Sequence, residues 1–584
     1  MMNINQKKMQ ALDLCKRGLF EEAEKIYKKI LEKKMNDSEV LNNLGMINLQ
    51  RGKLDNAEQY FEKNYLTNND KSSLINLINI KIQKQNYDEA EVLNEKTEKD
   101  DGYLQRKINF MIGKKDFEGA YKLNNKINEN NENLIKYKII TESYLLNKLN
   151  KHEDSYLFIK DVLTKKPELK RELNYNLGIV CIELNKLEEA EQIFQDNLDK
   201  NKNDNEALLN IGNINKKRRK FEAAENCFKE IIKNNKLNLK AHYNLAVLYF
   251  LTDKLEMAEQ EFNECLKISP NNPEANYGLA GVNLKKKNFE MGWEYYKWRL
   301  LSDPDKSFGI DDSHIKELKN ISKLLILYEQ GIGDVIFYAR FLPILEKEFS
   351  GEIIVFVEKR VSDLLNKVTK KIKYINNIEN IGKFSDYVKI NLGTLPKFYI
   401  KSICDISKIK NFKLNIINKK IENNVLKTNK NIGISWISKN KEWGNDKSLS
   451  TDDIKQILKQ FSEFNFYNLQ YGLSHNEIKK IKENNSNFIE LADIDKTNDI
   501  LELAILIQHL DLVITTSNVT AHISGALGKK TILLLPKSVG KLWYWVDEDE
   551  KSIWYKNTFI VKQEKDGCWK SVLNMLNQKL LDLI

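Results

Sequence analysis

The chain has 584 residues, which is more than one hydrophobic core usually serves, so we expect several domains. Its hydrophobic fraction of 41% is ordinary for soluble protein, no apolar run reaches membrane-spanning length, and the first residues lack the apolar segment of a signal peptide. The net charge of +10 comes from 93 basic and 83 acidic residues spread along the chain, without a basic motif typical of nucleic-acid binding. We therefore expect a cytoplasmic protein with no transmembrane segment and no nucleic-acid partner.

The N-terminal half repeats itself with a period of 34 residues. Small residues recur at two fixed places, and an aromatic residue follows the second place by four positions. The three series are Gly178, Gly212, Ala246 and Ala280; Ala190, Ala224, Ala258 and Gly292; and Phe194, Phe228, Phe262 and Tyr296. Small residues let two antiparallel helices approach closely, and the aromatic residue locks them together. Each unit is therefore predicted to be a helical hairpin.

This pattern resembles the tetratricopeptide repeat (TPR) family, as in Asn244-Leu245-Ala246, Tyr249, Ala258, Phe262 and Pro270. The resemblance implies a TPR solenoid over residues 1–304, with about nine helical hairpins that are irregular in length between residues 75 and 170. Such a solenoid offers a concave groove for a protein partner. The aromatic-rich end, Gly292 to Arg299, is expected to be a terminal helix that packs its aromatic residues against the next domain.

After a linker over residues 305–322, strands and helices alternate. A first α/β lobe is expected over residues 323–428, with strands at 324–328 and 353–357 and a helix at 335–345 between them. A second lobe is expected over residues 429–584. Its strands are predicted at 432–436, 466–470, 512–515 and 531–535, and its helices at 452–461 and 522–527. Two such lobes place a cleft between the carboxyl ends of their strands, where ligands bind.

The first lobe carries the motif Gly331-Ile332-Gly333-Asp334 directly after its first strand. Ile336 stands where the third glycine of a dinucleotide fingerprint would be, so a dinucleotide site is not favoured, and no Lys-Ser/Thr pair makes a phosphate-binding loop of the NTPase type. The two glycines are expected to let the backbone turn sharply and to place the Asp334 carboxylate at the helix start, facing the cleft.

The second lobe has a polar turn, Thr516 to Thr520, between a strand and a helix. Unpaired backbone N–H groups and the positive end of the helix dipole make such a turn a natural phosphate site. A simpler interpretation is that Ser517 or Asn518 only caps the helix.

These features together resemble a family of bacterial TPR glycosyltransferases related to the heptosyltransferases. The resemblance rests on Tyr328 to Asp334 with Phe337 to Pro343, on Ile432 to Trp436, on Leu469 to Gly472, and on Ala521-His522 with Gly525 to Lys529. It implies an α/β GT-B fold of two Rossmann-like lobes after the solenoid, with the acceptor side at 323–428 and the donor side at 429–584. It also implies sugar transfer from a nucleotide-diphosphate sugar with inversion, without a metal or a further cofactor.

The resemblance assigns roles to individual residues. Asp334 matches the catalytic carboxylate, although it can instead cap its helix. His522 matches a family histidine, although a helix histidine satisfied by a backbone carbonyl explains it equally well. The expected donor-binding residues are Gly331, Gly333, Ser435, Lys439, Lys441, Lys447, Gln470, Tyr471, Gly472, Ser517, Asn518, Val519, Thr520 and His522. Many relatives have aspartate and threonine where this chain has Ser517 and Asn518, so only the helix amides carry over there.

Our hypothesis is a glycosyltransferase in which Asp334 is the general base and the repeat array presents a protein or glycan acceptor. Lipopolysaccharide or another surface glycan is an alternative acceptor. A second hypothesis is an interaction scaffold that has lost catalysis. A third is a nucleotide-sugar epimerase, which shares the two-lobed fold but gives no reason for the repeats.

Overall fold

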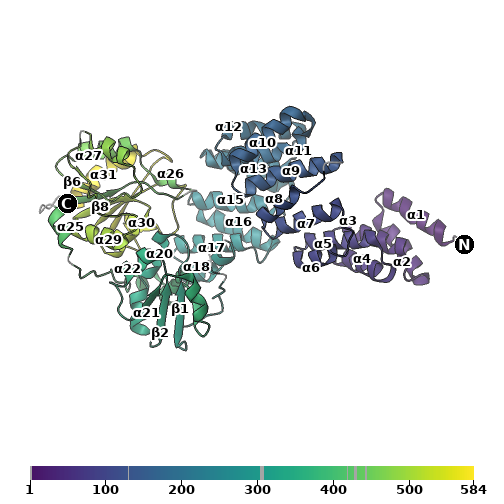
Figure 1. Cartoon of the computed structure of the whole chain (residues 1–584). Coiled ribbons are helices and arrows are strands. Elements are labelled where there is room, and N and C mark those ends of the chain that lie inside the picture. Colours follow the sequence, from purple (N-terminus) through teal and green to yellow (C-terminus); the bar gives the residue numbers. More distant parts are fainter. Residues whose placement is uncertain are drawn as a thin grey trace. The chain divides into compact units, whose positions relative to one another are not determined.

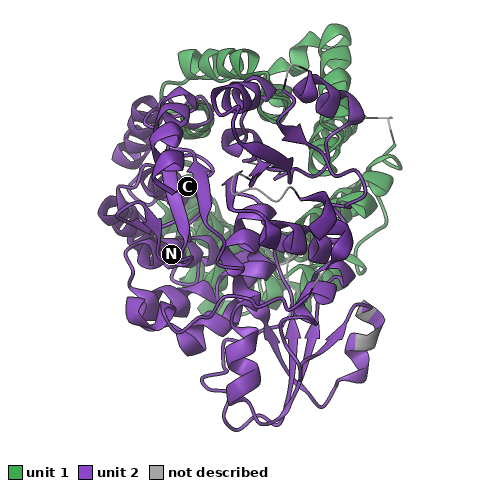
Figure 2. Ribbon diagram, turned by 90° about the vertical axis from the view of Figure 1, so that its left-hand side faces the viewer, with its two compact units in different colours: residues 1–214 green, residues 215–584 purple. Residues whose placement is uncertain are grey.

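A computed structural model of the chain describes residues 3–128, 131–302, 308, 310–416, 418–425, 431–440, 443–483 and 485–583 (Figure 1). It divides into two compact units, Met1–Ile214 and Asn215–Ile584, which Figure 2 shows in green and purple. The second unit contains both the later repeats and the two sheets. Among the described residues, no helix has the length and apolar character needed to cross a membrane.

The N-terminal half is helical, as the 34-residue period predicts, and consecutive helices pack in pairs such as α1 with α2 and α15 with α16. The helices are α1 (Ile4–Lys16), α2 (Phe20–Lys33), α3 (Ser38–Gln50), α4 (Leu54–Asn68), α5 (Lys71–Gln83), α6 (Tyr87–Asn94), α7 (Asp101–Gly113), α8 (Phe117–Asn124), α9 (Glu132–Lys148), α10 (His152–Lys165), α11 (Lys170–Glu183), α12 (Leu187–Lys200), α13 (Asn205–Lys217), α14 (Phe221–Asn234), α15 (Leu239–Leu251), α16 (Leu255–Ile268), α17 (Pro273–Lys285) and α18 (Phe289–Tyr296). The irregular region contains the short helices α6 and α8, of eight residues each.

The packing within the pairs follows from the small residues of the repeat. A Cβ atom on Gly178 would lie 2.4 Å from Phe194 Cζ, and one on Gly45 would lie 2.5 Å from Phe61 Cε1. Both distances are too short for a real side chain. The glycine therefore provides the space that the buried aromatic ring of the next helix fills, as the sequence predicted.

The first sheet has four parallel strands in the order β3-β2-β1-β4. They are β1 (Lys323–Leu327), β2 (Glu352–Phe356), β3 (Lys373–Ile375) and β4 (Val388–Asn391). The helices around them are α19 (Arg299–Ser302), α20 (Ile332–Ala339), α21 (Leu342–Glu348), α22 (Lys359–Leu365), α23 (Leu395–Tyr399), α24 (Ile403–Ile406) and α25 (Lys419–Asn424). After its first residue β1 is buried throughout, which is typical of a parallel strand covered on both faces.

The second sheet has eight strands in the order β10-β11-β12-β9-β8-β5-β6-β7. From β12 to β7 neighbouring strands are parallel, whereas β10 and β11 extend one edge antiparallel. The strands are β5 (Asn431–Ser435), β6 (Asn465–Asn468), β7 (Phe488–Ile489), β8 (Leu512–Thr516), β9 (Thr531–Leu535), β10 (Asp547–Glu548), β11 (Lys551–Ser552) and β12 (Thr558–Lys562). The helices are α26 (Gly444–Lys447), α27 (Thr451–Gln460), α28 (His475–Lys482), α29 (Ile500–His509), α30 (Val519–Ala526) and α31 (Lys570–Leu583).

The helix predicted over residues 335–345 is in fact two helices, α20 and α21, so the prediction of one continuous helix is wrong. Pro343 lies in the first turn of α21. A proline has no N–H to donate and its ring clashes with the carbonyl four residues earlier, so one continuous helix is not possible here. The break places Arg340 at the end of α20.

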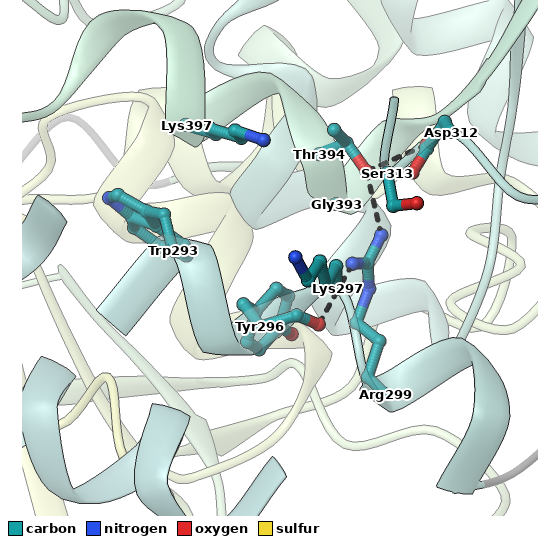
Figure 3. A pocket seen from close by; sticks show the side chains of 9 residues that line it. All are labelled: Trp293, Tyr296, Lys297, Arg299, Asp312, Ser313, Gly393, Thr394 and Lys397. Carbon is teal, nitrogen blue, oxygen red and sulfur yellow. Dashed lines mark hydrogen bonds between the residues drawn. The ribbon is translucent and has the colours of Figure 1, made fainter. Parts of the chain in front are cut away.

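The last repeat and the first sheet are joined by a buried ion pair between Arg299 and Glu329. Arg299 Nε donates to both carboxylate oxygens, at 3.1 and 3.0 Å, and its Nη2 donates to Thr394 Oγ1 at 3.0 Å. Thr394 in turn donates to Asp312 Oδ2 at 2.8 Å. Figure 3 shows this arginine among the residues that line a cavity of about 10 Å³, the space of about one water molecule.

An aromatic cluster joins three parts of the second unit, namely α18, α20 and the region after β9. Trp293 of α18 packs against Trp543 and Trp554, with ring centroids 5.6 and 6.3 Å apart. Phe337 of α20 lies 5.9 Å from Trp543 and 5.2 Å from Trp554. The aromatic end of the repeats therefore packs against the domain that follows, as predicted, and α18, α20 and the region after β9 share one hydrophobic core.

Breaking the buried ion pair tests how the repeats are joined to the first sheet. Arg299→Met leaves Glu329 buried without its cation, so we expect a loss of about 3–5 kcal/mol in the free energy of unfolding of the second unit. All eight tryptophans lie between Trp293 and Trp569, so urea unfolding followed by tryptophan fluorescence reports on this unit.

The matched control is Lys297→Met, which removes the part-exposed pair with Glu294 one turn away and is expected to cost at most about 1 kcal/mol. The double variant Arg299→Met/Glu329→Gln is expected to recover part of the loss. Equal small effects of Arg299→Met and Lys297→Met would contradict this account.

Candidate functional site

Asp334 lies in the first turn of α20 and is held by two hydrogen bonds. Its Oδ2 accepts from the Gly331 N–H at 3.3 Å, and its Oδ1 accepts from Tyr544 Oη at 3.2 Å. The helix-capping interpretation of Asp334 is thus confirmed. Burial raises the pKa of its carboxyl above the usual value, opposed by the two hydrogen bonds and by the charge of Lys447. Capping needs only one carboxylate oxygen of Asp334, which accepts from the Gly331 N–H. The capping role therefore does not exclude a second role as a proton acceptor.

The glycines before Asp334 act differently from what the sequence predicts. The residue with a left-handed backbone in this turn is Gln330, with φ of 64°, whereas Gly331 has φ of −81°. A Cβ on Gly333 would lie 2.9 Å from His522 Cδ2. Gly333 is therefore required for the close packing of α20 against α30, and the sharp turn does not depend on the two glycines.

His522, on α30, is buried at this helix contact. Its Nδ1 lies 2.9 Å from Tyr555 Oη, and its ring packs against Trp545 with centroids 4.9 Å apart. The interpretation as a bond to a backbone carbonyl is wrong for Nδ1, since its partner is this hydroxyl. Burial, followed by the charges of Lys447 and Arg340, lowers the pKa of His522 to about 3. The imidazole is therefore neutral at physiological pH.

The turn between β8 and α30 is ordered by its own side chains. Asn518 is the N-cap of α30, and its Oδ1 accepts from the Ala521 N–H at 3.3 Å, so the capping interpretation is confirmed for this residue. Ser517 Oγ accepts from Trp545 Nε1 at 2.8 Å. The hydroxyls of Thr516 and Thr520 are buried and have no hydrogen-bond partner in the described structure. Val519 is partly exposed at the helix start.

Three of the predicted donor-binding side chains form one buried network. Asn518 Nδ2 donates to Ser435 Oγ at 2.8 Å, and Ser435 Oγ donates to Gln470 Oε1 at 3.1 Å. Gln470 Oε1 also accepts from the backbone N–H groups of Trp436 and Ile437, at 2.9 and 2.7 Å. The network connects the carboxyl ends of β5, β6 and β8. These polar atoms therefore bond to one another and hold the loops after the three strands in place.

The predicted lysines fall in three different settings. Lys447, at the end of α26, is buried, and its charge acts on both Asp334 and His522. Lys439 is exposed, and its Cε lies 3.1 Å from where a Cβ of Gly472 would stand. Gly472 has φ of 71°, and its neighbour Tyr471 is partly buried. Lys441 lies outside the described residues.

Sequence reasoning missed the aromatic residues after β9 and β11. Tyr544 donates to Asp334, Trp545 donates to Ser517, and Tyr555 bonds His522. Burial, and then the charge of Asp334, hold the pKa of Tyr544 well above its usual range, so this phenol keeps its proton. For Tyr544 and Trp545 the sequence signal was the run Leu542 to Trp545, in which three of the four residues are aromatic.

Sequence reasoning also did not single out Arg340, which is buried at the end of α20. Its guanidinium stands 4.3 Å over the Tyr555 ring, and its Nε and Nη1 are buried without hydrogen-bond partners in the described structure. Its charge contributes to keeping His522 neutral.

The arrangement brings a proton acceptor close to cationic groups and a helix N-terminus. A carboxylate with a raised pKa is a stronger base than an ordinary aspartate. The first-turn N–H groups of α30 have no partner within the helix and can bind an anion. Lys447 adds positive charge at the same place. The geometry can therefore hold an anionic group near a carboxylate whose pKa is raised.

The neutrality of His522 gives a pH-dependent prediction. In the unfolded chain the imidazole protonates below about pH 6.5, whereas in the folded chain it stays unprotonated down to about pH 3. The unfolded state thus binds more protons, and the contribution of His522 to stability falls by up to about 1.4 kcal/mol per pH unit as the pH drops from 6.5 towards 3.

Fluorescence-detected urea unfolding at several pH values compares the wild type with His522→Asn, which we expect to lose less stability on acidification. His475→Asn, at an exposed position, serves as the control and should follow the wild type. Parallel curves for the wild type and His522→Asn would show that the folded protein does not hold this imidazole neutral.

Comparison with known proteins supports the prediction of tetratricopeptide repeats in the N-terminal half. Residues 8–69 and 209–273 match the tetratricopeptide repeat family. Protein FlbA of Caulobacter vibrioides is 25% identical over 339 residues, which is 50% of this chain and 52% of that protein, so the chain spans about half the length of this relative.

Among solved structures, the Cut9–Hcn1 hetero-tetramer of APC/C has a TM-score of 0.34 at 14% identity, over 52% of this chain and 61% of that one. A tetratricopeptide repeat protein of Parabacteroides merdae has a TM-score of 0.27 at 15% identity, over 52% of this chain and 94% of that one. Scores this low carry no further conclusion. The N-terminal region of this chain contains tetratricopeptide repeats, at residues 8–69 and 209–273.

Proposed function

We propose that the protein is a glycosyltransferase that moves a sugar from a nucleotide-diphosphate donor to a hydroxyl group of a protein or glycan, with inversion. The observation that carries the proposal is Asp334, whose pKa burial raises and whose position is fixed by Tyr544 and Gly331. The lobes around it would form a GT-B fold, with residues 323–428 on the acceptor side and 429–584 on the donor side.

The general base of this reaction takes the proton from the acceptor hydroxyl as that oxygen attacks the sugar. One oxygen of Asp334 accepts from Tyr544, and this hydrogen bond orients the carboxylate without protonating it, because Tyr544 keeps its own proton. Burial raises the pKa of this carboxyl, and a base with a higher pKa takes the proton of the acceptor hydroxyl more readily.

The leaving diphosphate would bind at the start of α30. The backbone N–H groups of Val519 and Thr520 lie in its first turn, and the unpartnered hydroxyls of Thr516 and Thr520 flank them. Lys447 supplies positive charge close to Asp334 and His522, and such a charge stabilises the developing diphosphate. The side chains of Ser435, Gln470, Ser517 and Asn518 act indirectly, by fixing the loops.

The repeat array would present the acceptor, since tetratricopeptide solenoids offer extended surfaces for protein partners. A surface glycan such as lipopolysaccharide is the alternative acceptor.

A second candidate function is an interaction scaffold without catalysis. The observation in its favour is that the polar side chains predicted to hold the donor are bonded to one another or to Trp545. The scaffold retains the repeats and their protein partner but binds no nucleotide sugar.

A transfer assay tests the proposal. A panel of radiolabelled nucleotide sugars is incubated with a cell lysate and either the wild type or Asp334→Asn. Because an amide cannot take the proton, we expect transfer by the variant to fall by about 10²–10⁴-fold. Donor binding, measured by calorimetry, should change much less, since the asparagine oxygen can still accept from Tyr544.

The matched control is Asp453→Asn. Asp453 occupies the same position in the first turn of α27 and also accepts a backbone N–H, but it is partly exposed and lies outside the site. This variant should transfer at the wild-type rate. Equal transfer by the wild type and Asp334→Asn would remove Asp334 as the base, and no transfer, hydrolysis or binding with any donor would favour the scaffold.

A further inference from the structure

The segment after β9, residues 536–546, contacts α20, α30 and the last repeats; we name it the 536–546 loop. At Tyr544 it bonds Asp334, and at Trp545 it bonds Ser517. The ring of Trp545 also packs on His522. Three predicted site residues therefore depend on where this one loop lies.

The same loop is anchored on the repeats. Lys541 Nζ donates to Asp253 Oδ2 at 2.8 Å, and Asp253 lies in the turn between α15 and α16. The side chain of Lys541 is 11% exposed and that of Asp253 is 43% exposed, so the lysine side of this ion pair is covered while the carboxylate is partly open to water. Trp543 packs against Trp293 and Tyr296 of α18, with centroids 5.6 and 5.8 Å apart.

Asp253 is itself fixed by the next repeat. Its Oδ1 accepts from Lys285 Nζ at 2.8 Å, and this buried lysine lies 4.1 Å over the Phe250 ring. The backbone of Asp253 is left-handed, with φ of 56°. The Asp253 carboxylate thus accepts hydrogen bonds from two lysines, Lys285 of α17 and Lys541 of the 536–546 loop. A shift of α17 or of the turn between α15 and α16 would therefore move the point at which the loop is held.

We propose that Asp253 is a positioning residue of the candidate site: through Lys541 it sets the 536–546 loop, and so the places of Tyr544 and Trp545 against Asp334 and Ser517. The role in catalysis rests on the proposed function, whereas the coupling itself does not. In this arrangement the last repeats are part of the site's support, beyond any role in presenting an acceptor.

The first arm of the test needs no ligand. The full chain is labelled with 5-fluorotryptophan, and the ¹⁹F resonance of Trp545 is assigned from its loss in Trp545→Phe. Asp253→Asn and Lys541→Met should each shift or broaden this resonance, and the double variant should show no larger change than either single one. Asparagine tolerates the left-handed backbone, so Asp253→Asn keeps the turn.

The matched control is the pair Lys286–Glu259, at 2.9 Å, which joins the same two repeats but does not contact the loop. Lys286→Met and Glu259→Gln should leave the Trp545 resonance unchanged. Trp436, which lies in a different hydrophobic cluster, should be unaffected in all variants.

The second arm measures the dissociation constants of uridine, guanosine and adenosine diphosphates by calorimetry. For whichever diphosphate binds the wild type, Asp253→Asn and Lys541→Met are expected to weaken binding about tenfold and Lys286→Met to leave it unchanged. A Trp545 resonance that stays in place in Asp253→Asn and Lys541→Met would overturn the inference. If no diphosphate binds the wild type, the proposed function fails, while the Trp545 resonance still decides the coupling.

Discussion

The candidate site depends on the close packing of α20 against α30, which the missing side chain of Gly333 permits. The two helices follow strands of different sheets, α20 after β1 and α30 after β8. The N–H groups in the first turn of each helix have no acceptor within that helix. Their contact brings Asp334 into the same buried region as His522 and Lys447. A Cβ at position 333 would collide with the imidazole, so the packing that places the Asp334 carboxylate near α30 depends on this glycine.

The second constraint is the joining of the repeats to both sheets by buried contacts. The Arg299–Glu329 pair links the last repeat to the end of β1, and the aromatic cluster around Trp293 and Trp543 links it to the region after β9. An ion pair buried in this way is costly to break, although it need not add net stability. Its role here is to define how the end of the solenoid meets the first sheet.

Much of this fold could be predicted from the sequence, because repeats and strands are local patterns. The 34-residue period predicted the helical hairpins. The apolar runs predicted the bounds of β1, β5, β8 and β9 to within about one residue. The break between α20 and α21 was readable in Pro343 and was overlooked. For the site, the motif around Asp334 and the turn before α30 identified two elements that do come together. The partners Tyr544, Trp545 and Tyr555 could not be predicted, because each bond joins residues far apart in the chain. For the same reason the internal use of Ser435, Gln470 and Asn518 was visible only in the structure.

The most direct test of the central claim is a crystal structure of the protein with a nucleoside diphosphate that it binds. We expect the diphosphate at the first turn of α30, within hydrogen-bond distance of the Val519 and Thr520 amides and on the side of that turn that faces Asp334. A diphosphate bound elsewhere, with the first turn of α30 free, would contradict it.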